Sequence, residues 1–300
     1  MRTKTYLFAL MAMALTLGSC SNDENGIGGE TSKYITVSTR IGNMTRVATD
    51  ANGGQTFEEG DEISVYAWTG DATVAPETSE RVVNNAINKL TNGSWVSTPQ
   101  MLWKNNRDNH YFIGVYPTAA ISDLTAGEYT FDVTKQEESD LLVAVNTDGI
   151  SYNADEQQTV PLTFTHVMAK LVVNLTYKNQ WGGIPTVEKV VVGNAAKEAT
   201  VNYLTKVITP STTIKEDISL PEITENTKYV SVIIPQEEVK QLTIVIGGKN
   251  YIYDNGTPFK LESGKITTIN LEVGRDEIKL GEVKISNWEE GSTFNGEALN

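Results

Sequence analysis

The sequence predicts an all-β protein, and three observations support that prediction. Short segments in which apolar and polar residues alternate recur along the chain, which is the period of a strand with one buried face. Dipeptides that tolerate positive φ separate several of these segments, namely Asn92-Gly93, Asp148-Gly149, Gly247-Gly248 and Asn255-Gly256. Helical periodicity is scarce. Many short strands with turn signals between them indicate antiparallel sandwiches, and a length of 300 residues favours two domains in tandem.

The expected strands follow one another from residue 34 to residue 288. The first, residues 34–41, places one apolar face toward a core, made of Ile35, Val37, Thr39 and Ile41. The second, residues 62–68, follows a turn at Gly60. Residues 80–90 carry the one fair helical pattern, and a strand is the alternative there. The remaining expected strands are residues 110–116, 128–133, 141–145, 159–164, 170–177, 187–192, 229–234, 241–246, 250–253, 266–273 and 283–288.

The first 19 residues have the layout of a secretory signal peptide. Two basic residues precede an apolar run over residues 6–17, and the small residues Gly18 and Ser19 follow it. The run is shorter than the roughly 20 helical residues that cross a bilayer core. We therefore expect residues 1–19 to be removed from the mature protein.

The residue after the small pair is Cys20, the only cysteine of the chain. The sequence Leu-Gly-Ser-Cys ending at Cys20 resembles the lipobox of bacterial lipoproteins. That resemblance implies cleavage between Ser19 and Cys20 and a diacylglycerol on the cysteine sulfur, with anchoring in outer-membrane lipid. A chance cysteine near a cleavage site is the alternative. Two acyl chains hold a protein stably on a membrane.

Residues 20–33 are polar and glycine-rich and are expected to form a flexible tether. The acidic pair Asp23-Glu24 resembles the export signal that moves some lipoproteins to the outer face of the outer membrane; a solvated spacer is the alternative. The formal net charge of −14 argues against nucleic acid and against anionic lipid surfaces. The polar stretch 153–158 is the expected boundary between domains 34–158 and 159–300.

Several segments, taken in order, are similar to the fimbrillin family, the subunits of type V pili on Gram-negative anaerobes. These segments are residues 44–46, 56–66, Trp103 with 111–117, 162–171 and 285–291. The resemblance implies two transthyretin-like antiparallel β-sandwich domains in tandem and a surface-exposed fimbrial subunit that serves adhesion. The implied partners are copies of itself or related fimbrial subunits, an arginine-specific surface protease, and a host or glycan ligand.

The resemblance also implies assembly by donor-strand exchange, in which a protease removes the N-terminal strand and the next subunit fills the groove. Residues 34–46 are then the removable strand, and Arg46-Val47 is the expected cleavage site because it lies in a stretch rich in Asp, Asn and Gly. Arg40 is the runner-up, inside the strand. A solvated charge is the alternative for either arginine. Removing Ile35, Val37 and Ile41 would uncover an apolar slot beside unpaired backbone groups.

The implied donor is the C-terminal tail, about residues 278–300. Ile278 and Leu280 alternate, Gly281 shifts the phase, and further apolar positions follow at Val283, Ile285 and Trp288. A glycine at such a phase break is typical of a bulge or a tight hairpin, so both one bulged strand and two short strands remain open. The alternative is that this segment completes its own sandwich.

Catalytic and metal-binding patterns are not evident in the sequence. His110 and His166 are expected to be structural, and two histidines without a free thiol are a poor zinc set. The acidic cluster 58–62 lies at a turn, and the tryptophans are expected in cores or at sandwich edges. We therefore predict no enzyme, no cofactor and no metal. The rival functions are a surface lipoprotein that binds glycans through exposed aromatic residues, and an anchor or tip subunit of a fimbria.

Overall fold

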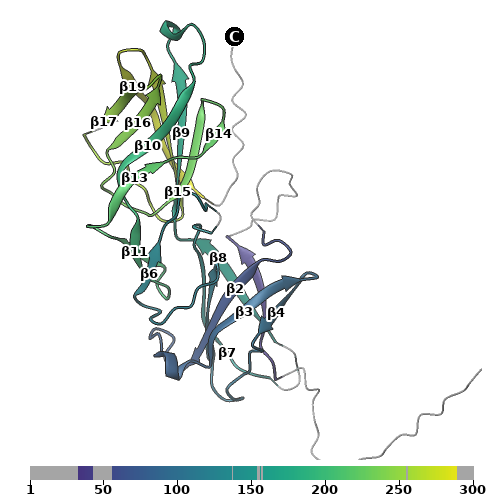
Figure 1. Ribbon diagram of the computed structural model, residues 1–300. Coiled ribbons are helices and arrows are strands. Elements are labelled where there is room, and N and C mark those ends of the chain that lie inside the picture. Colours follow the sequence, from purple (N-terminus) through teal and green to yellow (C-terminus); the bar gives the residue numbers. More distant parts are fainter. Residues whose placement is uncertain are drawn as a thin grey trace, which may run out of the picture.

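The computed structural model describes residues 33–42, 56–136, 138–153, 156, 158–254 and 256–288. Within these ranges the regular secondary structure is almost entirely strand, with two 3-10 turns, Thr78–Glu80 and Asn179–Trp181. Figure 1 shows two groups of strands stacked end to end, one from each half of the chain. The all-β prediction is confirmed. No helix in the described ranges is long and apolar enough to cross a membrane.

The N-terminal group is a seven-stranded sheet with the order β1-β8-β7-β5-β2-β3-β4. All its pairs are antiparallel except β1 and β8, which run parallel. The interior strand β2 is buried on both faces, so its buried residues form a continuous run rather than an alternation. The strands are β1 (Thr36–Ile41), β2 (Glu62–Thr69), β3 (Val83–Thr91), β4 (Ser94–Thr98), β5 (His110–Tyr116), β7 (Leu142–Ile150) and β8 (Thr159–His166).

Strand β3 occupies the segment whose spacing resembled a helix, so the strand alternative is correct there. Its pairing with β2 shifts register between Val65 and Ala67, and Asn85 adopts a φ of 56°. This bulge puts Val83 and Ala86 on the same buried side although they are three residues apart. A bulged strand therefore produces the three-residue apolar spacing that helices also show.

The C-terminal group packs a five-stranded sheet, β14-β15-β9-β18-β19, against a four-stranded sheet, β13-β10-β16-β17, over one hydrophobic core. Strands β9 and β18 are parallel, and their neighbours are antiparallel. The strands are β9 (Ala169–Tyr177), β10 (Val187–Ala196), β13 (Lys215–Ser219), β14 (Glu222–Thr224), β15 (Lys228–Ile233), β16 (Gln241–Ile246), β17 (Lys249–Asp254), β18 (Lys265–Val273) and β19 (Ile278–Asn287).

A third sheet, β12-β11-β6, joins the two groups. Its strands are β6 (Gly127–Thr130), β11 (Glu198–Asn202) and β12 (Val207–Pro210), so a strand of the first half pairs with the second. At Gly127 an added Cβ would lie 2.6 Å from Cε2 of Tyr203, which shows how closely the two halves approach. The core of the C-terminal group continues through this sheet to Tyr66 and Trp68 of β2.

The change of sheet along the chain falls between β8 and β9. Strand β8 pairs with β1 and with β7 in the N-terminal sheet, so a division after residue 158 would separate it from both partners. The polar stretch 153–158 lies in the connection between β7 and β8, two strands of that sheet. The next strand, β9, begins at Ala169 and belongs to another sheet.

Candidate functional site

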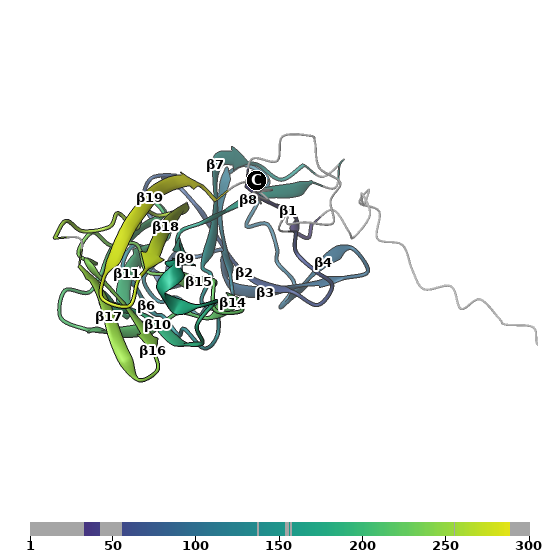
Figure 2. The ribbon, with the colours of Figure 1, turned by 90° about the horizontal axis from the view of Figure 1, so that it is seen from above.

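Strand β1 closes the N-terminal sheet by contacting both of its ends. Along its length it pairs with β8, from Thr36 opposite Thr159 to Ile41 opposite Phe164. Just before it, the backbone N–H of Ile35 donates to the carbonyl of Met101 at 2.9 Å, in the segment that follows β4. Without β1 and the residue before it, the edge of β8 and the segment after β4 would both lose these backbone hydrogen bonds. Figure 2 shows β1 beside β8.

Two side chains, one just before β1 and one within it, are part of the core beneath this strand. Ile35 and Val37 are only 2% and 6% exposed, and Ile41 is half-buried against the same cluster. Burying a side chain of this size contributes about 1.5–3 kcal/mol. The face predicted from the alternation is thus the buried one. Without β1, the chain would expose an apolar slot and the unpaired backbone of β8.

A groove of about 770 Å³ lies between β1 and the β3–β4 hairpin. Trp95 lines it and donates its indole N–H to Oγ1 of Thr39 at 3.0 Å, which ties β4 to β1. The ring of Phe57 packs edge-on against two other rings, with centroid distances of 5.3 Å to Trp95 and 5.1 Å to Phe164. The sequence predicted an apolar slot under β1; it offered no signal for the Trp95 contact from the opposite edge.

Of the two candidate cleavage sites, only Arg40 lies within the described residues. Arg40 lies within β1 opposite Thr163, and its Nε donates to Oγ1 of that threonine at 2.8 Å. Its backbone is part of the parallel ladder, where a protease cannot bind it in extended form without unpairing the strand. Arg46 and Val47 lie outside the described residues, as do Ser19 and Cys20.

The tail strand β19 pairs antiparallel with β18 and forms an edge of its own subunit's five-stranded sheet. Its register shifts between Ile269 and Leu271, opposite Gly281, so residues 278–287 form one bulged strand rather than two short ones. An added Cβ at Gly281 would lie 3.2 Å from the carbonyl oxygen of Asn270. In this state the tail completes its own sandwich, as the alternative reading expected.

The apolar side chains of the tail differ in burial. Ile278 and Leu280 are half-buried against the core, whereas Val283 and Ile285 are 40% and 41% exposed. Trp288, directly after the strand, is 7% exposed. Residues 289–300 lie outside the described residues. Within residues 278–288, the apolar contact is therefore concentrated at Trp288.

His166 lies beside Trp288 at the junction of the two groups of strands. Nδ1 of His166 is 2.9 Å from Oδ1 of Asp140, and its ring stacks on the Trp288 indole with centroids 4.1 Å apart. Nζ of Lys170 lies 5.5 Å from the centroid of the same indole. Burial lowers the pKa of Lys170, and the nearby Asp140 carboxylate opposes that shift. The sequence predicted that the imidazole of His166 is hydrogen-bonded, but it did not indicate Asp140 as the partner.

His110 is a buried imidazole whose hydrogen bonds define one neutral tautomer. Nε2 accepts the backbone N–H of Lys104 at 3.0 Å, so Nδ1–H donates to the carbonyl of Asp108 at 3.0 Å. A proton on Nε2 would face the Lys104 N–H, another donor. Burial is the main reason why the pKa of His110 is lowered from 6.5.

This arrangement predicts a pH dependence of stability. Because the pKa of His110 is lower in the folded than in the unfolded chain, the unfolded chain binds the proton first as the pH falls through 6.5. Stability from this group is therefore complete above that pH and decreases below it, by at most about 1.4 kcal/mol per pH unit. Urea unfolding between pH 7.5 and 5.5 should show a steeper loss for the wild type than for His110→Gln. If the free energy of unfolding changed equally with pH in both proteins, the lowered pKa of His110 would be contradicted.

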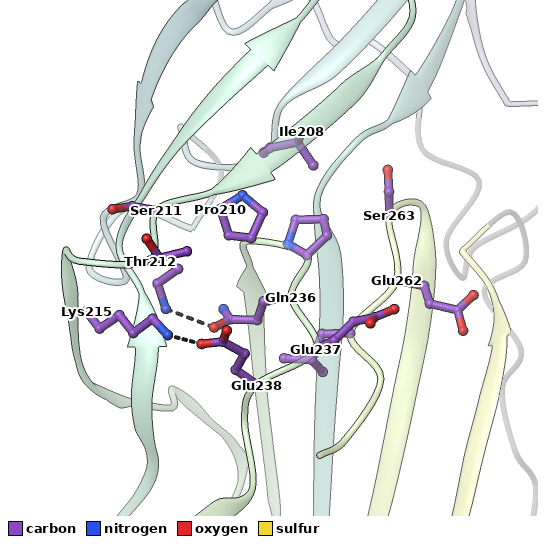
Figure 3. A pocket seen from close by; sticks show the side chains of 13 residues that line it. Ile208, Pro210, Ser211, Thr212, Lys215, Gln236, Glu237, Glu238, Glu262 and Ser263 are labelled. Atoms are coloured by element: carbon purple, nitrogen blue, oxygen red, sulfur yellow. Dashed lines mark hydrogen bonds and ion pairs between the residues drawn. The ribbon is translucent and has the colours of Figure 1, made fainter. Parts of the chain in front are cut away.

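A separate pocket of about 450 Å³ lies on the C-terminal group (Figure 3). Ile208 and Leu261 are among its apolar lining residues, and some of its polar lining groups are ion-paired or hydrogen-bonded. Lys215 forms an ion pair with Glu238, and Oε1 of Gln236 accepts the backbone N–H of Ala196 at 2.9 Å. Among the described residues, no three His, Cys, Asp or Glu side chains are grouped so that they could hold a metal ion.

The five tryptophans do not form an exposed aromatic platform. Trp68, Trp103 and Trp288 are buried, and Trp95 and Trp181 are half-buried. Stacking of sugar rings requires accessible aromatic faces on the surface, so the glycan-binding reading gains no support from the tryptophans.

The comparison with known families agrees with this geometry. The model of the fimbrillin-like family matches residues 45–288. The chain belongs to the fimbrillin-like family. In this fimbrillin-like chain, the segments that carried the resemblance meet around β8. Phe57 packs on Phe164, and Trp288 stacks on His166 at the end of the same strand.

Solved structures of low sequence identity share the fold. A candidate cell adhesion protein from Bacteroides uniformis is 20% identical, with a TM-score of 0.63 over 86% of this chain and 99% of that one. One from Bacteroides ovatus is 18% identical, with a TM-score of 0.61 over 85% and 98%. The tip fimbrial protein Mfa3 from Porphyromonas gingivalis, with a C-terminal truncation, is 11% identical, with a TM-score of 0.53 over 85% and 99%. No curated protein sequence matches the chain.

Proposed function

We propose that this chain is a structural subunit of a cell-surface fimbria that serves adhesion and polymerises by donor-strand exchange. Membership of the fimbrillin-like family supports the role of a fimbrial subunit. The proposal includes export as a lipoprotein anchored through Cys20 and activation by an arginine-specific protease that cuts between Arg46 and Val47. The protein acts without a cofactor and has no enzymatic role.

The observation that carries the exchange mechanism is the placement of β1. This strand is joined to the rest of the chain through the segment that contains Arg46, and the core beneath it includes its Val37 and the preceding Ile35. After cleavage, its departure would leave the edge of β8 unpaired and the slot empty. An extended segment from another subunit can supply the same backbone hydrogen bonds and apolar side chains.

The donor in this proposal is the tail that begins at β19. Its apolar positions, which alternate with a phase shift at Gly281, suit a strand that inserts side chains into a slot; they are Ile278, Leu280, Val283, Ile285 and Trp288. Because donor and acceptor lie on different parts of the subunit, each contact is head-to-tail. Such a contact does not close on itself and extends into a filament.

Brief trypsin treatment of purified protein beginning at Ser21 tests this proposal. Arg46 is the only lysine or arginine between residues 41 and 80, so cleavage in this region gives a chain starting at Val47. We expect that new N-terminus by mass spectrometry and a ladder of detergent-resistant multimers on an unboiled denaturing gel. The Arg46→Gln variant is the matched control and should give neither.

Two outcomes would overturn the proposal. A chain that is cut at Arg46 and stays monomeric would exclude activation by loss of β1 and would favour an anchor subunit. A ladder in the Arg46→Gln variant would show that multimers form without this cleavage. A new N-terminus at Ile41 would assign the cut to Arg40 instead.

A further inference from the structure

The tail strand has few side-chain contacts with its own subunit. Every side chain of β19 is exposed or half-buried, and the first buried side chain of the tail is Trp288. Apart from the half-buried Ile278 and Leu280, the strand is attached by its backbone ladder to β18. Backbone hydrogen bonds of this kind can be re-formed on any open strand edge, so they do not favour one edge over another. Retention of the tail on its own subunit therefore depends most on Trp288.

The indole of Trp288 occupies a site built from three side chains. The imidazole of His166 lies parallel to it, with an interplanar angle of 5° and centroids 4.1 Å apart. Asp140 holds that imidazole at 2.9 Å through Nδ1, and both side chains are largely buried. The ammonium of Lys170 lies 5.5 Å from the indole centroid, within the range of a cation–π contact.

This site spans the boundary between the two groups of strands. His166 is the last residue of β8, Asp140 precedes β7, and Lys170 is the second residue of β9. The backbone N–H of Trp288 donates to the carbonyl of Gly264 at 3.1 Å, in the turn before β18. Trp288 is thus held by His166 of the N-terminal sheet as well as by its own sandwich.

We propose that Asp140, His166 and Lys170 form a binding site for the indole of Trp288, and that this contact keeps the tail on its own subunit until strand exchange. The second part rests on the proposed function. Asp140 fixes the plane of the imidazole, which provides the stacking surface. When the tail leaves, the backbone ladder is re-formed elsewhere, whereas the contacts of the indole with these three side chains are lost. Trp288 therefore controls how readily the tail becomes available as a donor.

Hydrogen–deuterium exchange of the uncut monomer tests the binding site without requiring polymerisation. We expect the amides of β19 to exchange at least tenfold faster in Trp288→Ala than in the wild type, while the amides of β5 keep their rates. Ile285→Ala is the matched control, because it also removes an apolar side chain from the tail but one that is 41% exposed. It should leave the exchange of β19 within about twofold of the wild type.

Variants of the receptor residues complete the test. His166→Ala should accelerate exchange in β19, and His166→Phe, which keeps an aromatic face, should restore most of the protection. Unchanged exchange of β19 in Trp288→Ala would overturn the proposal, and so would equal acceleration in β5, since Trp288 would then be a general core residue. After trypsin treatment, Trp288→Ala should form multimers faster. Faster exchange in β19 without any multimers would support the binding site and refute the proposed function.

Discussion

Replacing Val37 with aspartate is expected to destabilise the protein by about 3 kcal/mol or more, because a carboxylate would enter a site that is closed to water. Val37 is 6% exposed and lies opposite Val160, which is completely buried. The aspartate would either remain buried without a partner or pull β1 from the sheet. Urea unfolding followed by fluorescence measures the loss.

The neighbouring Ser38 provides a matched control for this substitution. Ser38 lies on the opposite, exposed face of the same strand, so Ser38→Asp adds the same charge without burying it. Its effect should stay within about 0.5 kcal/mol. If the two substitutions had equal effects, the side chains of β1 would not contribute to its attachment, and an apolar slot beneath it could not select a donor strand.

Replacing Phe164 with alanine is expected to cost about 3–5 kcal/mol in the free energy of unfolding, the range found when a buried phenylalanine leaves a cavity. Phe164 is completely buried in β8, and Phe57 contacts its ring edge-on at 5.1 Å. The ring also covers Gly114, where an added Cβ would lie 2.7 Å from Cζ of Phe164. Thermal and urea unfolding of the purified variant measure the effect.

Gly114 provides an internal check on this prediction. In the wild type, Gly114→Ala should destabilise by about 1–3 kcal/mol because the new methyl overlaps the ring. In the Phe164→Ala background the same methyl enters the emptied space and keeps only its close contact with Cδ1 of Leu162 at 3.1 Å, so its cost should fall in a double-mutant cycle. Additive effects of the two substitutions would contradict the close contact between them.

The strands and the family could be predicted because the responsible signals are local or ordered along the chain. Burial of one face produces the alternation of residues 34–41, and β1 (Thr36–Ile41) lies within that range. The order of the motif segments predicted the family, and the fimbrillin-like model confirms it over residues 45–288. The structural role of His110 follows from its apolar neighbours, and its hydrogen bonds bear this out.

Other features depended on residues far apart in sequence. The bulge at Asn85 changes the apolar spacing of β3, and only pairing with β2 distinguishes it from a helix. The parallel pairing of β1 joins it to β8, more than a hundred residues later, and no local pattern specifies that partner or its direction. For the same reason no local pattern shows that β8, after the polar stretch 153–158, pairs with β1 and β7.

By itself, the sequence determined that the chain is all-β, which faces of its strands are buried, and which family it resembles, because periodicity and motif order are properties of the chain alone. The tertiary structure decided that the tail forms one bulged edge strand and that its indole stacks on His166 beside Asp140. Stacking and hydrogen bonding act over a few ångströms between residues brought together only by folding. Local sequence patterns therefore do not predict these contacts.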